Sequence, residues 1–129
     1  MTGHNIFYEL QGTKAVPHNV EDLPTKSLLK NIKTSFVGPY FVSTVFLGIN
    51  HSHDPDGPPV LFETMAFDME DSRATGRIGK DFSSERSSTY HEALETHDRI
   101  IDECYERWDP SPWQQVVYWI MGLVGMNRA

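Results

Sequence analysis

Two histidines and two aspartates lie close together in the stretch HSHDPDG, which runs from residue 51 to residue 57. Neutral imidazole is a common ligand of zinc, copper, nickel and iron, whereas paired carboxylates suit harder cations. In an extended segment His51 and His53 would point to the same side, and Asp54 and Asp56 would add oxygen ligands. These residue types at this spacing raise the hypothesis of a metal site.

The same stretch also has the composition of a hairpin loop. Asp-Pro and Asp-Gly dipeptides form turns, and the Gly-Pro-Pro of residues 57–59 would lead rigidly into a following strand. A calcium loop does not fit, because the twelfth position counted from Asp54 is Met65, where a bidentate glutamate is required. We therefore predict a polar hairpin loop with no metal and no cofactor. A metal-dependent enzyme at residues 51–56 stays as an alternative.

Other catalytic patterns are incomplete. His91 and His97 in HEALETH are six residues apart, which places them on different sides of a helix and prevents them from sharing one ion. His97 belongs to an apolar stripe and is expected to be a hydrogen-bonded core residue. Cys104 falls on the same stripe, where a thiol is normally inert. We expect no catalytic residues, which argues against an enzyme without excluding one.

Apolar periodicity predicts the elements of the N-terminal half. Alternation on either side of Gly12 indicates two short strands over residues 5–18, and a short helix is predicted over residues 21–33. Residues 41–67 contain two strands that should pair antiparallel. The first of these strands is apolar on both faces, which is typical of a central strand.

Residues 68–88 are predicted to be a polar excursion, which either forms an arm or contains a short strand near residues 78–82. The rest of the C-terminal half is predicted to be helical. Thr89 and Glu92 have capping-box spacing at the start of a long helix over residues 89–108, and an apolar terminal helix follows at 112–125. We predict a single α+β domain, residues 1–129. A small, mainly antiparallel sheet centred on the 41–67 hairpin would be packed by both helices.

The terminal helix is apolar on all sides, although a terminal helix in so short a chain is difficult to bury completely. If one face packs on the domain, Tyr118, Trp119 and Met126 remain for another molecule. Tyrosine and tryptophan often dominate protein interfaces. We therefore predict these three residues to be partner-binding, either with another protein or with a second copy of the chain in a homo-oligomer.

Composition limits the class of protein. A chain of 129 residues with 39% hydrophobic residues suits one domain, and a formal charge of −7 disfavours a nonspecific nucleic-acid binder. No apolar run reaches the roughly twenty residues of a spanning helix, and the N-terminus lacks the pattern of a signal peptide. With one cysteine, the chain cannot form an internal disulfide. A cytoplasmic protein is expected.

The central text resembles a family of small bacteriophage and prophage proteins that share the pattern VSTVFLG-x-x-H … GPP-x-LFETM-x-F and a helix opening YST-x-x-EA. The matching residues are Val42–Gly48, His51, Gly57–Pro59, Leu61–Met65 and Phe67, followed by Ser87–His97; YELQGTKAVPH, residues 8–18, matches more weakly. This family carries no known activity, so the resemblance implies an origin rather than a mechanism. The segment 68–86 and the tryptophan-rich terminal helix depart from the shared pattern.

These observations lead to a hypothesis of function. We expect a phage-derived accessory protein that acts by binding a host or phage protein in the host cell cytoplasm. His51 and Glu63 lie within the shared text and are further candidates for partner binding. A minor structural protein of the virion is a second alternative, beside the metal-dependent enzyme.

Overall fold

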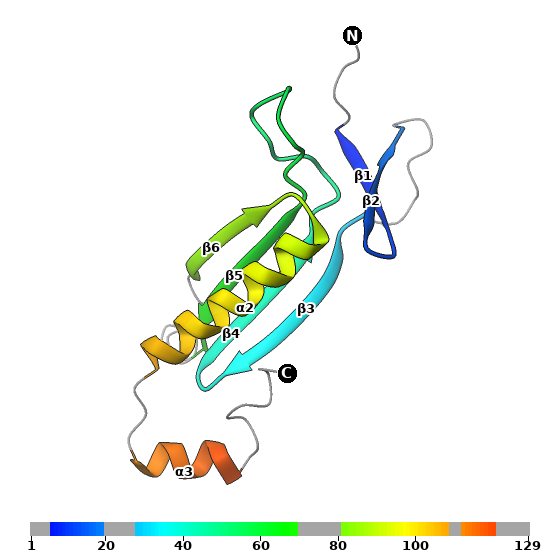
Figure 1. Ribbon diagram of the computed structural model, residues 1–129. Helices are drawn as coiled ribbons and strands as arrows, with labels where there is room; N and C mark the ends of the chain where they lie inside the picture. Colours follow the sequence, from blue (N-terminus) through cyan, green and yellow to red (C-terminus); the bar gives the residue numbers. More distant parts are fainter. Residues whose placement is uncertain (1–5, 20–27, 70–80, 109–111, 121–129) are drawn as a thin grey trace.

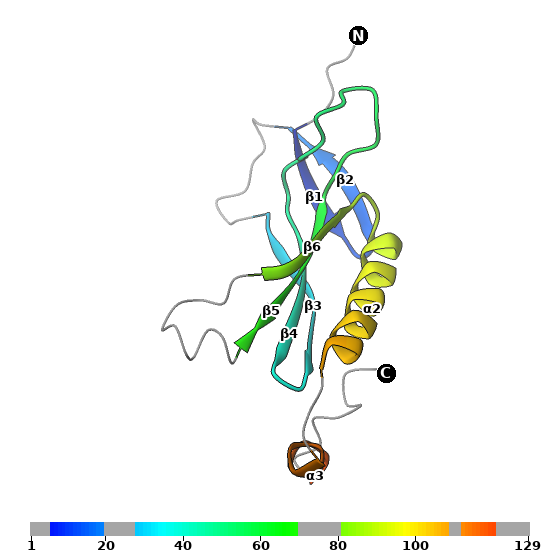
Figure 2. The ribbon, with the colours of Figure 1, turned by 90° about the vertical axis from the view of Figure 1, so that its left-hand side faces the viewer.

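The computed structural model describes residues 6–19, 28–69, 81–108 and 112–120. Its centre is a four-stranded antiparallel sheet in the order β3-β4-β5-β6, and one face of this sheet is covered by the long helix α2 (Figures 1 and 2). A separate two-stranded sheet, β1-β2, lies at one end of the domain. The predicted α+β class is confirmed.

The N-terminal hairpin forms where alternation predicted it. Strands β1 (Phe7–Gln11) and β2 (Lys14–His18) pair antiparallel around a turn at Gly12, whose φ is 64°. Three backbone contacts tie β1 to the segment that follows β4. The amide of Tyr8 donates to the carbonyl of Gly48, the amide of Asn50 donates to Ile6, and Phe7 forms an isolated bridge with Ile49. The hairpin is therefore attached to the main domain through its first strand.

The prediction of a helix over residues 21–33 is wrong for its last residues. Strand β3 (Lys30–Val37) begins at Lys30 and pairs with β4 (Tyr40–Phe46), with a bulge between Asn31 and Lys33. The spacing of Leu28, Leu29 and Ile32 suited a helix, but pairing with β4 satisfies the backbone and places Ser35 and Val37 in the core. Residues 21–27 of the predicted helix lie outside the described residues.

The predicted 41–67 hairpin is confirmed as β4 and β5 (Phe62–Asp68), paired antiparallel from Tyr40↔Asp68 to Phe46↔Phe62. Strand β4 has neighbours on both sides, as its two apolar faces predicted. A further strand, β6 (Asp81–Ser87), pairs with β5 and occupies the end of the predicted polar excursion. Residues 70–80 of that excursion lie outside the described residues.

Helix α2 (Tyr90–Arg107) begins with the predicted capping box. Thr89 Oγ1 accepts a hydrogen bond from the Glu92 amide, and a Glu92 carboxylate oxygen accepts one from the Thr89 amide, both at 3.1 Å. The buried side of α2 consists of Ala93, His97, Ile100, Ile101 and Cys104. It packs on the sheet in two core clusters, one around Val37, Val42 and Ala66, the other around Leu10, Phe46, Leu61 and Phe62.

Gly38 in the β3–β4 turn provides a test of how α2 is held at its C-terminal end. Its φ is 55°, and an added Cβ would lie 2.5 Å from the ring of Trp108. We expect Gly38→Ala to lower the free energy of unfolding by about 2–3 kcal/mol, from backbone strain plus displacement of Trp108.

Gly12→Ala is the matched control for Gly38→Ala, because its φ is 64° and nothing lies within 4 Å of the added Cβ. It should cost only the backbone strain, about 1–2 kcal/mol. Urea denaturation of both variants measures the difference. Equal losses would show that the Trp108 contact at Gly38 contributes nothing to stability.

Helix α3 (Pro112–Ile120) confirms the start of the predicted 112–125 helix, and residues 121–125 lie outside the described residues. The prediction that this helix packs beside α2 is not met. Figures 1 and 2 show α3 beyond the end of the sheet that carries the β3–β4 turn, and four of its apolar side chains, those of Trp113, Val116, Trp119 and Ile120, are exposed. In the described ranges, no helix has both the length and the apolar character needed to cross a membrane.

Candidate functional site

The His-Asp stretch lies in the long loop between β4 and β5, and Asn50 holds the two arms of this loop together. Asn50 Oδ1 accepts hydrogen bonds from the amides of Ser52 (2.8 Å) and Val60 (2.9 Å). The amide of His51 donates to the carbonyl of Val60 at 2.9 Å. The loop is therefore an ordered hairpin tip closed at its base.

Asp54 takes part in the turn at the tip of this loop. The Asp54 carboxylate accepts a hydrogen bond from the Asp56 amide at 3.0 Å, and the Asp54 carbonyl accepts one from the Gly57 amide at 3.1 Å. Within the described ranges, no three His, Cys, Asp or Glu side chains converge as metal ligands would. The contacts seen here are those of a polar turn, and none of them supports the metal-site hypothesis.

The two candidate residues from the shared sequence pattern, His51 and Glu63, lie on different elements. His51 is half-buried in the β4–β5 loop, whereas Glu63 lies on β5, where its carboxylate accepts a hydrogen bond from Arg86 Nε at 3.0 Å. This ion pair joins β5 to β6 on the sheet face opposite α2, because Glu63 alternates with the buried Phe62 and Thr64. The structure gives no composite site made of His51 and Glu63.

A buried polar network joins α2 to three strands. His97 is 0% exposed; its Nε2 lies 2.9 Å from Ser35 Oγ, and its Nδ1 lies 2.7 Å from Thr44 Oγ1. Thr44 Oγ1 lies in turn 2.6 Å from Thr64 Oγ1. Burial, with a smaller contribution from the charge of Lys33, lowers the pKa of His97 to about 4, whereas Asp98 acts in the opposite direction. The imidazole is therefore neutral at pH 7, and both of its nitrogens are hydrogen-bonded.

The Ser35–His97 contact has the atoms of a nucleophile and its base, but its surroundings do not suit catalysis. Ser35 is 1% exposed and Thr44 and Thr64 are 0% exposed, so no substrate can reach the hydroxyl. The network satisfies polar groups inside the core, as predicted for His97. The sequence did not lead us to predict the hydrogen-bond partners of His97. A single threonine among apolar residues on one face of each of two strands, Thr44 on β4 and Thr64 on β5, was a signal that could have indicated them.

Cys104 is also inert in this fold. It is 0% exposed and burial raises its pKa to about 11, so the thiol stays protonated at neutral pH. This agrees with its predicted place on the buried stripe of the helix.

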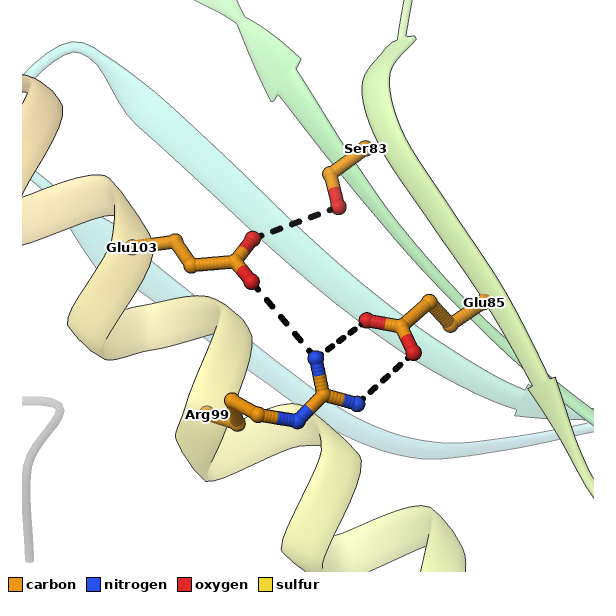
Figure 3. A network of polar contacts seen from close by, with 4 residues as sticks. All are labelled: Ser83, Glu85, Arg99 and Glu103. Carbon is orange, nitrogen blue, oxygen red and sulfur yellow. Dashed lines mark hydrogen bonds and ion pairs between the residues drawn. The ribbon is translucent and has the colours of Figure 1, made fainter.

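A second polar network lies at the surface, where α2 meets the edge strand β6 (Figure 3). Arg99 donates to both carboxylate oxygens of Glu85, one of these bonds being 2.7 Å long, and also contacts Glu103, which accepts from Ser83 Oγ at 3.5 Å. The hydrogen bond from Arg99 lowers the pKa of Glu85. These contacts fasten β6 to α2, and because the side chains are about half exposed, their contribution to stability is modest.

The sheet face opposite α2 carries a row of aromatic rings across three strands. Phe36 and Phe41 have ring centroids 5.2 Å apart, and Phe41 and Phe67 have centroids 6.1 Å apart. Phe36 is 44% exposed, and no described helix or strand covers this face (Figure 2).

The most exposed large apolar side chains of the described residues lie on one side of α3. Trp113 and Trp119 are each 73% exposed, Ile120 is 70% exposed and Val116 is 44% exposed. At 100° per residue these four side chains form one stripe about 120° wide. Of the predicted partner-binding residues, Trp119 lies in this stripe. The side chain of Tyr118 and the whole of Met126 lie outside the described residues.

A pocket lies between the N-terminal hairpin, the β4–β5 loop and the start of α2. Its volume is about 380 Å³, and its walls come from residues 8 and 13–15, residues 58–59 and residues 88–90. Leu61 and Phe62, which belong to the core, also line it. Sequence reasoning missed this pocket, because three segments far apart in the chain form it.

A comparison of the chain with protein-family descriptions, with curated proteins and with solved structures gave no match.

Proposed function

We propose that the protein acts by binding another protein, and that the exposed stripe of α3 is the surface that enters the partner. The observation that carries the proposal is the 73% exposure of both Trp113 and Trp119 on one short helix. An exposed indole keeps a large apolar surface in water, and burial of that surface in a partner is favourable. Side chains at positions 113, 116 and 120 have the spacing by which an amphipathic helix enters an apolar groove.

The partner is expected to be a host or phage protein. This assignment rests on the resemblance of residues 42–67 to small phage proteins, and it places the protein in the host cell cytoplasm or in the virion. Mass spectrometry of purified particles separates the two locations. A fixed copy number of this chain per particle would indicate a minor structural protein of the virion rather than an accessory protein.

The central test is the pair of substitutions Trp113→Gln and Trp119→Gln. Tryptophans at interface hot spots contribute about 2 kcal/mol or more, so each substitution should weaken partner binding about 30-fold. Both side chains are largely exposed, so the free energy of unfolding should change by less than about 0.5 kcal/mol. Photo-crosslinking from position 119 in the producing cell identifies the partner, with position 106 on the exposed side of α2 as the control.

The outcome that would contradict the proposal is equal crosslinking from positions 119 and 106, or partner binding that is unchanged in the double variant. Crosslinks only between copies of the chain would mean that the stripe forms a homo-oligomer. Native mass spectrometry of the untagged protein reports this state directly. The same spectrum tests the metal-dependent alternative, which requires one bound ion that is lost in His51→Ala.

A further inference from the structure

The pocket at the start of α2 has the form of a ligand site. It is about 380 Å³ in volume, within the range of pockets that hold small ligands or a single large side chain. Two buried core side chains lie beneath it, Leu61 at 1% exposed and Phe62 at 0% exposed. A ligand that enters would pack against Tyr8, Ala15 and Tyr90, which are partly buried and lie against this core cluster.

The walls of the pocket suit a flat ring. Tyr8 and Tyr90 line it from β1 and α2, and Pro58 and Pro59 line it from the loop. Tyr90 already packs edge-on against Phe62, with ring centroids 6.2 Å apart and an interplanar angle of 86°. Aromatic rings favour such edge-to-face and offset arrangements, so a further ring is the apolar group that these walls accept best.

One of the residues that line the pocket is charged. Among the lining residues that the structure describes, Lys14 is the one that carries a charge. At the neighbouring start of α2, the capping box already satisfies the amides of Thr89 and Glu92 and holds the Glu92 carboxylate against the Thr89 amide. An acidic group would therefore be bound by the Lys14 ammonium, with the hydroxyls of Thr13 and Ser88 nearby in the lining.

From this combination we propose that the pocket binds an aromatic ring bearing an acidic group. The group is either a small aromatic acid or the C-terminal aromatic residue of a peptide, whose free carboxylate provides the same chemistry. The site is independent of the stripe on α3, so either proposal can fail without the other.

The test is a titration of the whole protein with 2-naphthoate and with its neutral counterpart 2-naphthamide, followed by amide chemical shifts in NMR spectra. We expect 2-naphthoate to bind about tenfold more tightly, with shifts centred on Ala15, Leu61 and Thr89. Equal binding of both compounds would overturn the acidic part of the proposal. Shifts centred on residues 113–120 instead would overturn the site.

Two variants sharpen the test. Lys14→Gln keeps most of the side chain and removes the charge. This variant should therefore bind 2-naphthoate and 2-naphthamide with about equal affinity. Lys33→Gln removes the same charge from β3, outside the pocket lining, and should leave the preference intact. Ala15→Phe fills the pocket and should abolish binding of both compounds. If it does not fold, the wild-type shift map and Lys14→Gln still decide the question.

A second titration distinguishes the sources of the ring. The probes are acetyl-Gly-Gly-Trp with a free carboxylate and the same peptide amidated. Tighter binding of the acid peptide than of 2-naphthoate supports a peptide C-terminus as the ligand, whereas tighter binding of 2-naphthoate supports a small aromatic acid. Failure of both acids to bind at millimolar concentration would overturn the proposal.

Discussion

Replacing His97 with alanine is expected to lower the free energy of unfolding by about 4 kcal/mol. The substitution leaves the buried hydroxyl of Ser35 without its hydrogen-bond partner and removes one partner of Thr44. Each buried polar group that loses its partner costs about 1–3 kcal/mol, and the cavity left by the ring adds to this. Urea denaturation followed by circular dichroism measures the change.

His91→Ala is the matched control, because it removes the same type of side chain from the same helix. The side chain of His91 is 84% exposed, and its Nε2 lies 3.3 Å from a carboxylate oxygen of Glu95 one turn away. Its loss should change stability by less than about 0.5 kcal/mol. A similar small effect at both positions would show that the Ser35–His97–Thr44 network does not hold α2 on the sheet.

Acidification from pH 6.5 to pH 4 is expected to remove about 3 kcal/mol of stability through His97 alone. Burial lowers the pKa of this imidazole from 6.5 to about 4, so the unfolded chain takes up the proton first as the pH falls. The stability provided by the neutral imidazole is fully present above pH 6.5 and is lost progressively down to pH 4. Unfolding free energies measured at half-unit steps of pH test this expectation.

His97→Gln isolates this contribution, because glutamine keeps hydrogen-bonding groups and does not titrate. The variant should be less stable at pH 7 but should lose about 3 kcal/mol less than the wild type between pH 6.5 and pH 4. Glu85, whose pKa is lowered by Arg99, also loses its contribution as the pH falls below about 4.5, but it does so in both proteins. Parallel pH profiles of the two proteins would contradict the assignment of the effect to His97.

Elements with strong local signals could be predicted from the sequence. Thr89 and Glu92 marked the first turn of α2 because the capping box is a local contact between residues three apart. The apolar residues on both faces of β4 predicted a central strand, and β4 does lie between β3 and β5, although one of its faces is only partly buried. The error at β3 arose where the local pattern of Leu28, Leu29 and Ile32 suits a helix and pairing with a distant strand decides otherwise.

Candidate sites were harder to predict than elements. The sequence identified the loop at residues 51–57, but Asn50, which closes it, was not singled out. It placed His97 in the core without showing that Ser35 and Thr44, 62 and 53 residues away, would satisfy its two nitrogens. The pocket at Lys14 and Tyr90 was not predicted, because its walls are brought together only when the hairpin packs near the start of α2.

The sequence by itself determined the α+β class, the capped helix, the 41–67 hairpin and the buried position of His97. These follow from periodicity, caps and turn residues, which act between neighbours in the chain. The tertiary structure decided the strand at residues 30–37, the partners of His97, the pocket beside α2 and the exposure of Trp113 and Trp119. Each of these depends on contacts between segments distant in the sequence, or on their absence among the described residues, and local patterns do not encode such contacts.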